Sequence, residues 1–398
     1  MATTMSAEER LDFWRLVAGQ FLIYSGFFAF FQFPLFIKSM GGDEGTIGLI
    51  MGISSLAAAL MMPIQGPLME RTALKPLVTG GNLLLIVTTL FCLSLTEPGL
   101  MMALLILTRG LAFSVSQNSS STFLARIIPK AERARRLGIV FAGSTAATAF
   151  GPALGEAAIH FWGFPALFWG SSGLLLFGTL LMSTVSPPVE MEKNPEPFRM
   201  FSSYFGFFQE LAKPRLRFLF LTLLAMACAI GGLFNFTATY TSGMGLSSGV
   251  FFVAFSGLNM TARIGAGGLS DKLGRPAVVL PSIIMFSVGL AVYSFMGGLW
   301  TLIGAAMLTG FGFSLINPTI SAQMLDQTPT KLHGTSMVAF HFAYSTGMMI
   351  AVPVLGLVAS DYGYRIMWWG LVGMVLLGGL LYLIGETKGP GITDAEPA

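Results

Sequence analysis

The 398-residue chain is 54% hydrophobic and only 10% charged, with a net charge of +3. A soluble domain normally has about a quarter of its residues charged, so no water-soluble fold would hide this much apolar surface. The small basic excess lies between apolar runs, which argues against a nucleic-acid partner. Cys92 and Cys228 also lie in apolar runs, without metal-binding or disulfide spacing, so we expect neither a metal nor a cofactor.

Apolar runs long enough to cross a bilayer follow one another along the chain, each covering the roughly 20 residues that a spanning helix needs. Twelve such spans are expected, at residues 14–37, 46–69, 77–96, 99–124, 137–160, 162–185, 216–240, 248–269, 277–297, 299–324, 333–359 and 363–385. The one long polar interruption, residues 186–213, is rich in proline and charge. We therefore predict an all-α membrane protein with six-helix halves at residues 1–185 and 214–398, joined by a cytoplasmic linker.

The basic residues predict the orientation of the chain in the membrane. If the N-terminus is inside, eighteen of the 22 Lys and Arg residues fall in inner segments, and only Lys38 and Arg365 fall in outer ones. Cytoplasmic loops retain Lys and Arg, and this alternation requires an even number of spans. We expect a multi-pass protein of a bacterial inner membrane with both termini in the cytoplasm.

The two halves of the chain repeat each other at an offset of 200 residues. Eight of the twenty positions from 162 to 181 are identical to the residues 200 positions later. Further identities at this offset are Pro76 with Pro276, Gly110 with Gly310, Phe113 with Phe313, Ser114 with Ser314 and Pro129 with Pro329. Two facing repeats create a central cleft that opens to either side by rocking, which is the geometry of alternating access.

A loop motif at the joint between the expected eighth and ninth spans identifies a family. Residues 267–276 read GGLSDKLGRP, which resembles the G-x-L-x-D-x-x-G-R loop of the major facilitator superfamily. The first-half joint has Glu in place of Asp and lacks the second glycine. The resemblance implies two pseudo-symmetric six-helix bundles with gating loops at these joints. The candidate gating residues are Gly268, Asp271, Gly274, Arg275, Glu70 and Arg71.

The fifth span carries a second, partial resemblance. Gly151, Pro152 and Gly155 resemble the G-x-x-x-G-P-x-x-G pattern of exporters in this superfamily, with Ala147 in place of the first glycine. Small residues allow close helix contact, and a proline bends the helix axis. The pattern favours export, and a kink that serves packing alone is the alternative.

Ionisable side chains inside expected spans are candidates for the transport pathway, because burying a charge costs free energy unless it meets a cavity or a partner. Arg109 resembles the family's fourth-helix arginine, which is implicated in coupling protons to transport. Arg263 either supports the Asp271 loop or binds an anionic cargo. Glu156 either carries protons or is solvated near the outer interface. His341 either titrates during transport or is simply hydrogen-bonded in the cleft.

A set of uncharged polar side chains in the expected spans needs hydrogen-bond partners: Gln20, Tyr24, Gln32, Gln117, Asn118, Asn235, Tyr240, Asn259, Asn317, Gln323 and Tyr344. In the family fold, spans 1, 2, 4, 5, 7, 8, 10 and 11 line the cavity, and this set falls in those spans, with Asn82 as the exception. Some of them must satisfy one another between helices. The pathway candidates among them are Gln20, Tyr24, Asn235, Asn317 and Tyr344.

The sequence contains no phosphate-binding GxxxxGK[ST] loop and no hydrolase constellation, so we expect a protein that is not an enzyme and does not hydrolyse ATP. The first hypothesis is a monomeric exporter of metabolites, sugars or drugs, whose partners are the lipid bilayer, the small-molecule substrate and protons. Two alternatives remain open: an importer of an organic anion, and a membrane receptor that has lost transport.

Overall fold

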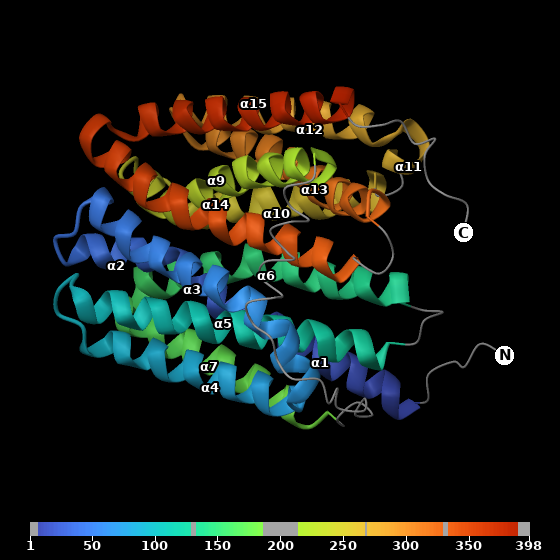
Figure 1. Ribbon diagram of the computed structural model, residues 1–398. Coiled ribbons are helices and arrows are strands. Elements are labelled where there is room, and N and C mark those ends of the chain that lie inside the picture. Colours follow the sequence, from blue (N-terminus) through green and yellow to red (C-terminus); the bar gives the residue numbers. More distant parts are fainter. Residues whose placement is uncertain (1–6, 129–132, 186–213, 267–268, 329–332, 389–398) are drawn as a thin grey trace.

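The computed structural model describes residues 7–128, 133–185, 214–266, 269–328 and 333–388. Every regular element in these ranges is helical. The helices form two bundles that lie side by side (Figure 1). The expected linker, residues 186–213, lies outside the described residues.

The first bundle contains six long helices. They are α1 (Ala7–Phe28), α3 (Glu44–Arg71), α4 (Leu74–Phe91), α5 (Leu100–Ile127), α6 (Arg133–Trp162) and α7 (Phe164–Ser183). The first span continues beyond α1 through a 3-10 turn, η1 (Ala29–Gln32), into the short helix α2 (Phe33–Ser39). Pro34 has no backbone N–H to donate, so the regular hydrogen bonding of α1 does not extend through it. A second 3-10 turn, η2 (Cys92–Ser94), follows α4.

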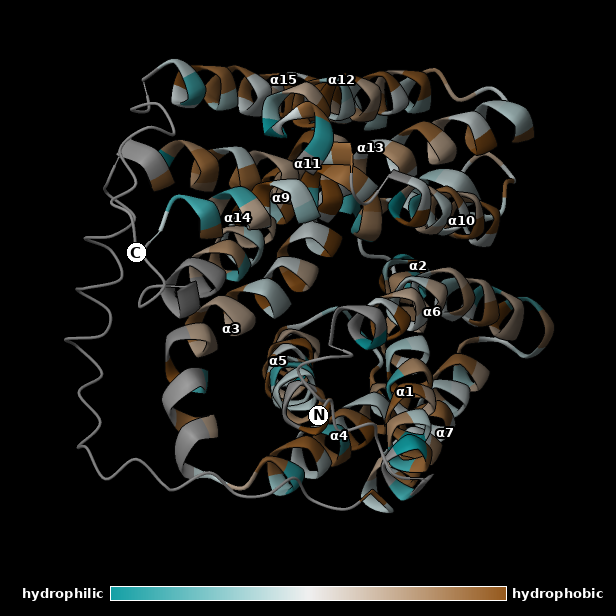
Figure 2. Cartoon of the chain, turned by 90° about the vertical axis from the view of Figure 1, so that its right-hand side faces the viewer, coloured by the Kyte–Doolittle hydropathy of each residue, from teal (hydrophilic) through white to brown (hydrophobic). Residues whose placement is uncertain are grey.

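The second bundle repeats this plan with a short additional helix. Its elements are α9 (Pro214–Ser242), α10 (Ser248–Ala266), α11 (Leu269–Leu273), α12 (Arg275–Ser294), α13 (Leu299–Asp326), α14 (His333–Tyr362) and α15 (Tyr364–Lys388). Seen along the helices in Figure 2, α1, α4, α5, α6 and α7 group apart from α9, α10 and α12–α15. The architecture of two six-helix bundles predicted from the sequence is confirmed.

Eleven helical segments among the described residues are long and apolar enough to cross a bilayer. The expected eighth span, α10, is not one of them, since it includes Asn259 and Arg263. This helix packs between α6 and α13. The Asn259 side chain donates to the backbone carbonyl of Gly310 over 3.3 Å, so a neighbouring helix supplies the partner that lipid lacks.

The molecule has two ends that the rest of the argument distinguishes. The terminal end contains the start of α1 and the end of α15; the opposite end, called the gate end, contains the α2–α3, α9–α10 and α14–α15 connections (Figure 1). Two turns at the gate end occupy equivalent places in the repeat: Gly163 has φ +81° and Gly363 has φ +85°. Glycine adopts this left-handed region without steric cost, which explains the repeated residue.

The repeat also accounts for one close helix contact inside each bundle. A Cβ atom on Gly110 of α5 would overlap with the backbone carbonyl oxygen of Ser54 in α3, and one on Gly310 of α13 would overlap with that of Phe255 in α10. Glycine therefore lets each helix pair approach to backbone contact. The two halves use the same packing device at equivalent positions.

Candidate functional site

The two most extensive contacts between the bundles are those of α3 with α14 and of α6 with α10, and α2 and η1 make smaller contacts with α9. Along α3 and α14 the two helices approach each other closely at glycines. A Cβ atom on Gly48 would lie 2.7 Å from the carbonyl oxygen of Val352 and 2.9 Å from the Cα of Gly356. One on Gly52 would lie 2.5 Å from the ring of Pro353. Only residues without a side chain allow this approach, so the seam between α3 and α14 depends on glycine.

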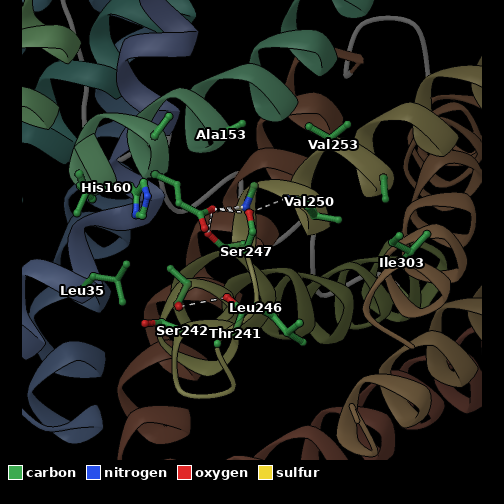
Figure 3. A pocket seen from close by; sticks show the side chains of 18 residues that line it. Leu35, Ala153, His160, Thr241, Ser242, Leu246, Ser247, Val250, Val253 and Ile303 are labelled. Atoms are coloured by element: carbon green, nitrogen blue, oxygen red, sulfur yellow. Dashed lines mark hydrogen bonds between the residues drawn. The ribbon is translucent and has the colours of Figure 1, made fainter. Parts of the chain in front are cut away.

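The contact between α6 and α10 is instead built on a carboxylate. One oxygen of Glu156, Oε2, accepts hydrogen bonds from the hydroxyls of Ser247 at 3.0 Å and Ser248 at 2.9 Å, and from the backbone N–H of Gly249 at 2.5 Å (Figure 3). Ser248 is the first residue of α10. Glu156 therefore caps the N-terminus of a helix in the opposite bundle, where the free N–H groups and the helix dipole favour a negative charge.

Gln32 adds a third element to this contact. Its side-chain amide donates to the Ser248 hydroxyl at 2.8 Å and to the backbone carbonyl of Pro152 at 3.0 Å. The Gln32 side chain is fully buried. The turn η1 after α1 is thereby linked to both α6 and α10.

A cavity of about 800 Å³ lies beside Glu156 at the gate end (Figure 3). Apolar side chains of α2, α6, α10 and α13 form much of its wall, among them Leu35, Val253 and Ile303. Its polar lining comprises Glu156, His160, Thr241, Ser242, Ser247 and Ser248. The carboxylate that joins the two bundles thus borders an open space.

Asp43 and Glu44 make a smaller polar contact where α3 begins. Asp43 caps α3, because its Oδ1 accepts from the backbone N–H of Thr46 at 2.8 Å and from its hydroxyl at 2.6 Å. The other Asp43 oxygen accepts from the Ser360 hydroxyl of α14 at 3.1 Å. Glu44 accepts from the hydroxyl of Tyr364 at 3.2 Å. Both acids therefore contact the second bundle.

The hydrogen bonds from the Thr46 side chain and backbone lower the pKa of Asp43 below its ordinary 3.8, since they stabilise the carboxylate. A carboxyl group of lowered pKa stabilises the folded protein above its ordinary pKa, and this contribution is lost as the pH falls through the folded-state value. We expect Asp43→Ala to lower the unfolding free energy by about 1 kcal/mol at neutral pH, as loss of a helix N-cap does. Asp43→Asn, which keeps a capping oxygen, should lose less. Thermal unfolding of the detergent-solubilised protein measures both, and equal losses would contradict the capping role.

Arg109 lies inside the first bundle. Its guanidinium donates to the hydroxyl of Thr89 in α4, and its Cζ stands 3.4 Å from the ring centroid of Phe30 and 5.1 Å from that of Phe27. The residue is 3% exposed, and its Nη2 has no hydrogen-bond partner among the described residues. Aromatic faces therefore surround this cation, and no described acid pairs with it. The structure does not bring it together with Glu156 or Arg263.

Three of the other candidates meet in the second bundle. The hydroxyl of Tyr344 in α14 donates to the side-chain oxygen of Asn317 in α13. Arg263 of α10 is close enough to Tyr344 to interact electrostatically with it, and its buried Nε has no described hydrogen-bond partner. The cluster lies closer to the terminal end than the Glu156 contact, since Arg263 follows Ser248 by fifteen residues, or roughly 22 Å of helix.

The remaining pathway candidates are dispersed. Gln20 donates to the hydroxyl of Tyr24 over 2.8 Å, and both side chains are buried in the first bundle. The side chain of Asn235 donates to the carbonyl of Gly231, one turn earlier in α9, at 2.8 Å. His341 is exposed on α14.

The candidates of the gating loop are only partly visible. Arg275, at the start of α12, donates to the hydroxyl of Ser270 at 2.8 Å and pairs with Asp326 at 3.0 Å. It thereby ties α12 to the end of α13 inside the second bundle. Gly274 before it has φ +87°. Gly268 and the side chains of Asp271, Glu70 and Arg71 lie outside the described part of the structure.

The candidates for helix packing lie on the face of α6 toward α1 and η1. A Cβ atom on Gly151 would lie 2.6 Å from the carbonyl oxygen of Ser25, and one on Gly155 would lie 2.9 Å from that of Ala29. Pro152 lies within α6 between them. This close approach places Gln32 of η1 against α6, where its side chain reaches both Pro152 of α6 and Ser248 of α10.

Several residues of the bundle interface were not predicted as site residues, among them Asp43, Glu44, Ser247 and Ser248. A Ser-Ser pair before an apolar run is a signature of a helix N-terminus. It indicates a cap but does not identify the carboxylate from another helix that occupies it.

The model of the family described as the Major Facilitator Superfamily matches residues 16–275 and 248–397. The chain belongs to the major facilitator superfamily. It is therefore a multi-pass membrane protein and a secondary transporter, and not an enzyme.

Among similar proteins of this superfamily is the multi-drug resistance efflux pump PmrA of Streptococcus pneumoniae, which is 24% identical over 356 residues, covering 83% of this chain and 85% of the pump. An uncharacterized MFS-type transporter of Pseudomonas aeruginosa is 27% identical over 169 residues, and the match covers 42% of each protein.

Two solved structures show the same fold. The nucleoside transporter NupG superimposes with a TM-score of 0.77 at 14% identity, over 95% of this chain and 100% of that one. The human organic anion transporter MFSD10 gives a TM-score of 0.68 at 16% identity, over 94% of this chain and 100% of that one. At these identities the likeness concerns the fold alone.

Proposed function

We propose that this superfamily member exports small organic solutes, such as metabolites, sugars or drugs, in exchange for protons. The observation that carries the proposal is the placement of the contacts between the bundles. The glycine seam of α3 and α14 and the Glu156 contact of α6 and α10 both lie at the gate end. Polar groups inside each bundle lie nearer the terminal end. A solute site between them would be closed toward the gate end, as one state of alternating access requires.

The proposed direction of transport uses the orientation that the basic residues predict. With the terminal end in the cytoplasm, the closed gate end faces the outside of the cell. A transporter in this state opens its central site to the cytoplasm, which is the loading step of an exporter and the release step of an importer. The match to an efflux pump over most of the chain favours export.

The side chains near the centre favour an amphipathic cargo. In the first bundle, Phe27 stacks on Phe113 with ring centroids 3.5 Å apart, next to Tyr24. In the second, the ring of Phe340 lies 5.3 Å from that of Tyr344. Aromatic faces beside hydroxyl and amide groups suit molecules with both apolar and polar parts.

Import of an organic anion is less well supported. That hypothesis needs the two membrane arginines to face the cargo together. Arg109 is enclosed by aromatic rings and Thr89 within the first bundle. Of the two arginines, only Arg263 is then left to bind an anionic cargo, beside Tyr344 in the second bundle.

Proteoliposomes loaded with a lipophilic fluorescent dye test the proposal. An imposed pH gradient should drive dye across the membrane against the proton flow, and a protonophore should abolish that movement. Empty liposomes under the same gradient are the control. Dye and protons moving in the same direction would indicate symport. No flux with any of a panel of dyes, sugars and metabolites would favour the receptor hypothesis.

A further inference from the structure

We infer that Glu156 controls opening of the gate end through its protonation. As a carboxylate it caps α10 across the interface between the bundles and holds the gate end shut, and a proton from the adjoining cavity weakens this contact. We call the contact of Glu156 with Ser247, Ser248 and Gly249 the latch. The inference rests on the proposed exchange of solute for protons, and it names the group through which a proton would act on the gate.

The geometry of the contact makes it sensitive to rocking of the bundles. Glu156 belongs to α6 of the first bundle, and its three donors, on Ser247, Ser248 and Gly249, belong to the second. All three bonds end on the same oxygen, Oε2. Separation of the bundles at the gate end therefore breaks them together.

The strength of the latch depends on its charge. Hydrogen bonds to an ionised acceptor are roughly twice as strong as those between neutral groups. The unpaired N–H groups and the dipole at the start of α10 add a preference for negative charge. When a proton adds to the free oxygen, Oε1, the carboxylate becomes a neutral acid whose Oε2 is a weaker acceptor. The closed state thereby loses stability without losing its shape.

The internal repeat places different contacts at the positions that correspond to Glu156 and Ser248. At the 200-residue offset, Glu156 corresponds to Gly356 and Ser248 corresponds to Gly48. Gly48 and Gly356 meet each other across α3 and α14 by backbone contact. The equivalent place between α6 and α10 holds a carboxylate and a hydroxyl instead. The two-fold plan of the fold thus places a glycine contact opposite the Glu156 contact, and the acids on the glycine side, Asp43 and Glu44, lie at the start of α3.

A proton reaches Glu156 through the cavity at the gate end. Glu156 lines this space together with the α9–α10 connection, including Gly245 and Ser247 (Figure 3). Its Oε1 has no hydrogen-bond partner among the described residues, so it is available to a proton carried by water.

Few other charges face this group. His160, one turn later on α6, is the other titratable residue of the cavity lining. The described charged residues of α1 and α10 lie near the terminal end, and α7 contains none. From α9 the cavity receives only the hydroxyls of Thr241 and Ser242 as polar side chains. His160 is therefore the group in this cavity from which the role of Glu156 must be separated, and Asp43 and Glu44 are the carboxylates that join the bundles at the start of α3.

Electron-paramagnetic distance measurements test the latch without any transported solute. Spin labels at Trp162→Cys on the first bundle and Trp300→Cys on the second would report opening of the gate end, because both residues are highly exposed there, at 75% and 81%. The native Cys92 and Cys228 are buried and are replaced by alanine. We expect the wild-type distance distribution to shift from short to long as the pH falls. In Glu156→Gln the long-distance population should be raised about tenfold relative to the short one, and its response to pH should fall to what Asp43 and Glu44 contribute at the other contact.

His160→Gln is the matched control, since it removes the neighbouring titratable group from the same cavity wall. It should keep the pH response of the wild type. The inference would be overturned if His160→Gln loses the pH response and Glu156→Gln keeps it. It would also be overturned if the Glu156→Gln protein remains closed and pH-sensitive. If low pH opens the gate end but the protein shows no proton-linked flux, the proposed exchange of solute for protons is wrong and the role of Glu156 stands. If proton-linked flux occurs but the gate end does not respond to pH, the role of Glu156 is wrong and the proposed exchange stands.

Discussion

Replacing Gly356 by valine is expected to abolish closure of the gate end and to reduce solute transport by an order of magnitude or more. A side chain at this position would overlap with the backbone carbonyl of Glu44 and with the Cα of Gly48 on α3. Overpacking a tight contact costs about 1–3 kcal/mol, which corresponds to a roughly 5–150-fold shift between two states. The cost falls only on the closed state, because the contact joins the two bundles. Initial rates in proteoliposomes, with size-exclusion profiles to verify folding, measure the effect.

Gly373→Val supplies the control for this experiment. It makes the same chemical change in a helix of the same bundle, but no atom lies within 4 Å of a Cβ built at Gly373. Transport by this variant should equal that of the wild type. If Gly356→Val also transports normally, the backbone seam between α3 and α14 is not part of a closed state that the transport cycle visits.

Arg109→Ala is expected to abolish proton-driven transport while the protein remains folded in the membrane. The guanidinium is a full positive charge in a buried site of low dielectric constant, where its field is little screened. The substitution loses the hydrogen bond to Thr89 and the stacking on Phe30, but it also removes the desolvation cost of a charge that no described acid compensates. We therefore expect a large loss of flux with a small change in melting temperature.

Two further variants separate the charge of Arg109 from its contacts. Thr89→Val removes the hydrogen-bond acceptor and keeps the charge, so it should retain most of the transport. Arg109→Lys keeps the charge but not the planar group that stacks on Phe30, and should be intermediate. Normal proton-driven flux in Arg109→Ala would exclude Arg109 from the mechanism. Flux lost in Thr89→Val as well would assign its importance to local packing.

Both predictions concern features that are asymmetric within a symmetric plan. Gly110 and Gly310 make the same close contact in each bundle, and Gly163 and Gly363 make the same turn. Arg109 corresponds at the 200-residue offset to Thr309, whose hydroxyl bonds within its own helix. Glu156 corresponds to Gly356. The repeat thus builds the scaffold, and the ionisable groups stand where the two halves differ.

Much of the fold was predictable from the sequence, because a spanning helix must satisfy its own backbone and present an apolar surface over a fixed length. The spans follow from that requirement, and the pairing of the spans into two repeats follows from the residue identities at the 200-residue offset. The α10 helix is the least clear of these spans. Its Asn259 and Arg263 weaken the hydropathy signal, and only the neighbouring helices show how the polar groups are accommodated.

The sequence by itself determined the solvent of this protein, its duplicated plan and the few side chains whose burial demands a reason. Only the tertiary structure decided their partners. Ser248 lies 92 residues after Glu156, and Thr89 lies 20 residues before Arg109, so neither contact follows from local pattern. Such pairs form when rigid helices dock, since docking brings a helix N-terminus or an aromatic face against a charge that the unfolded chain leaves in water.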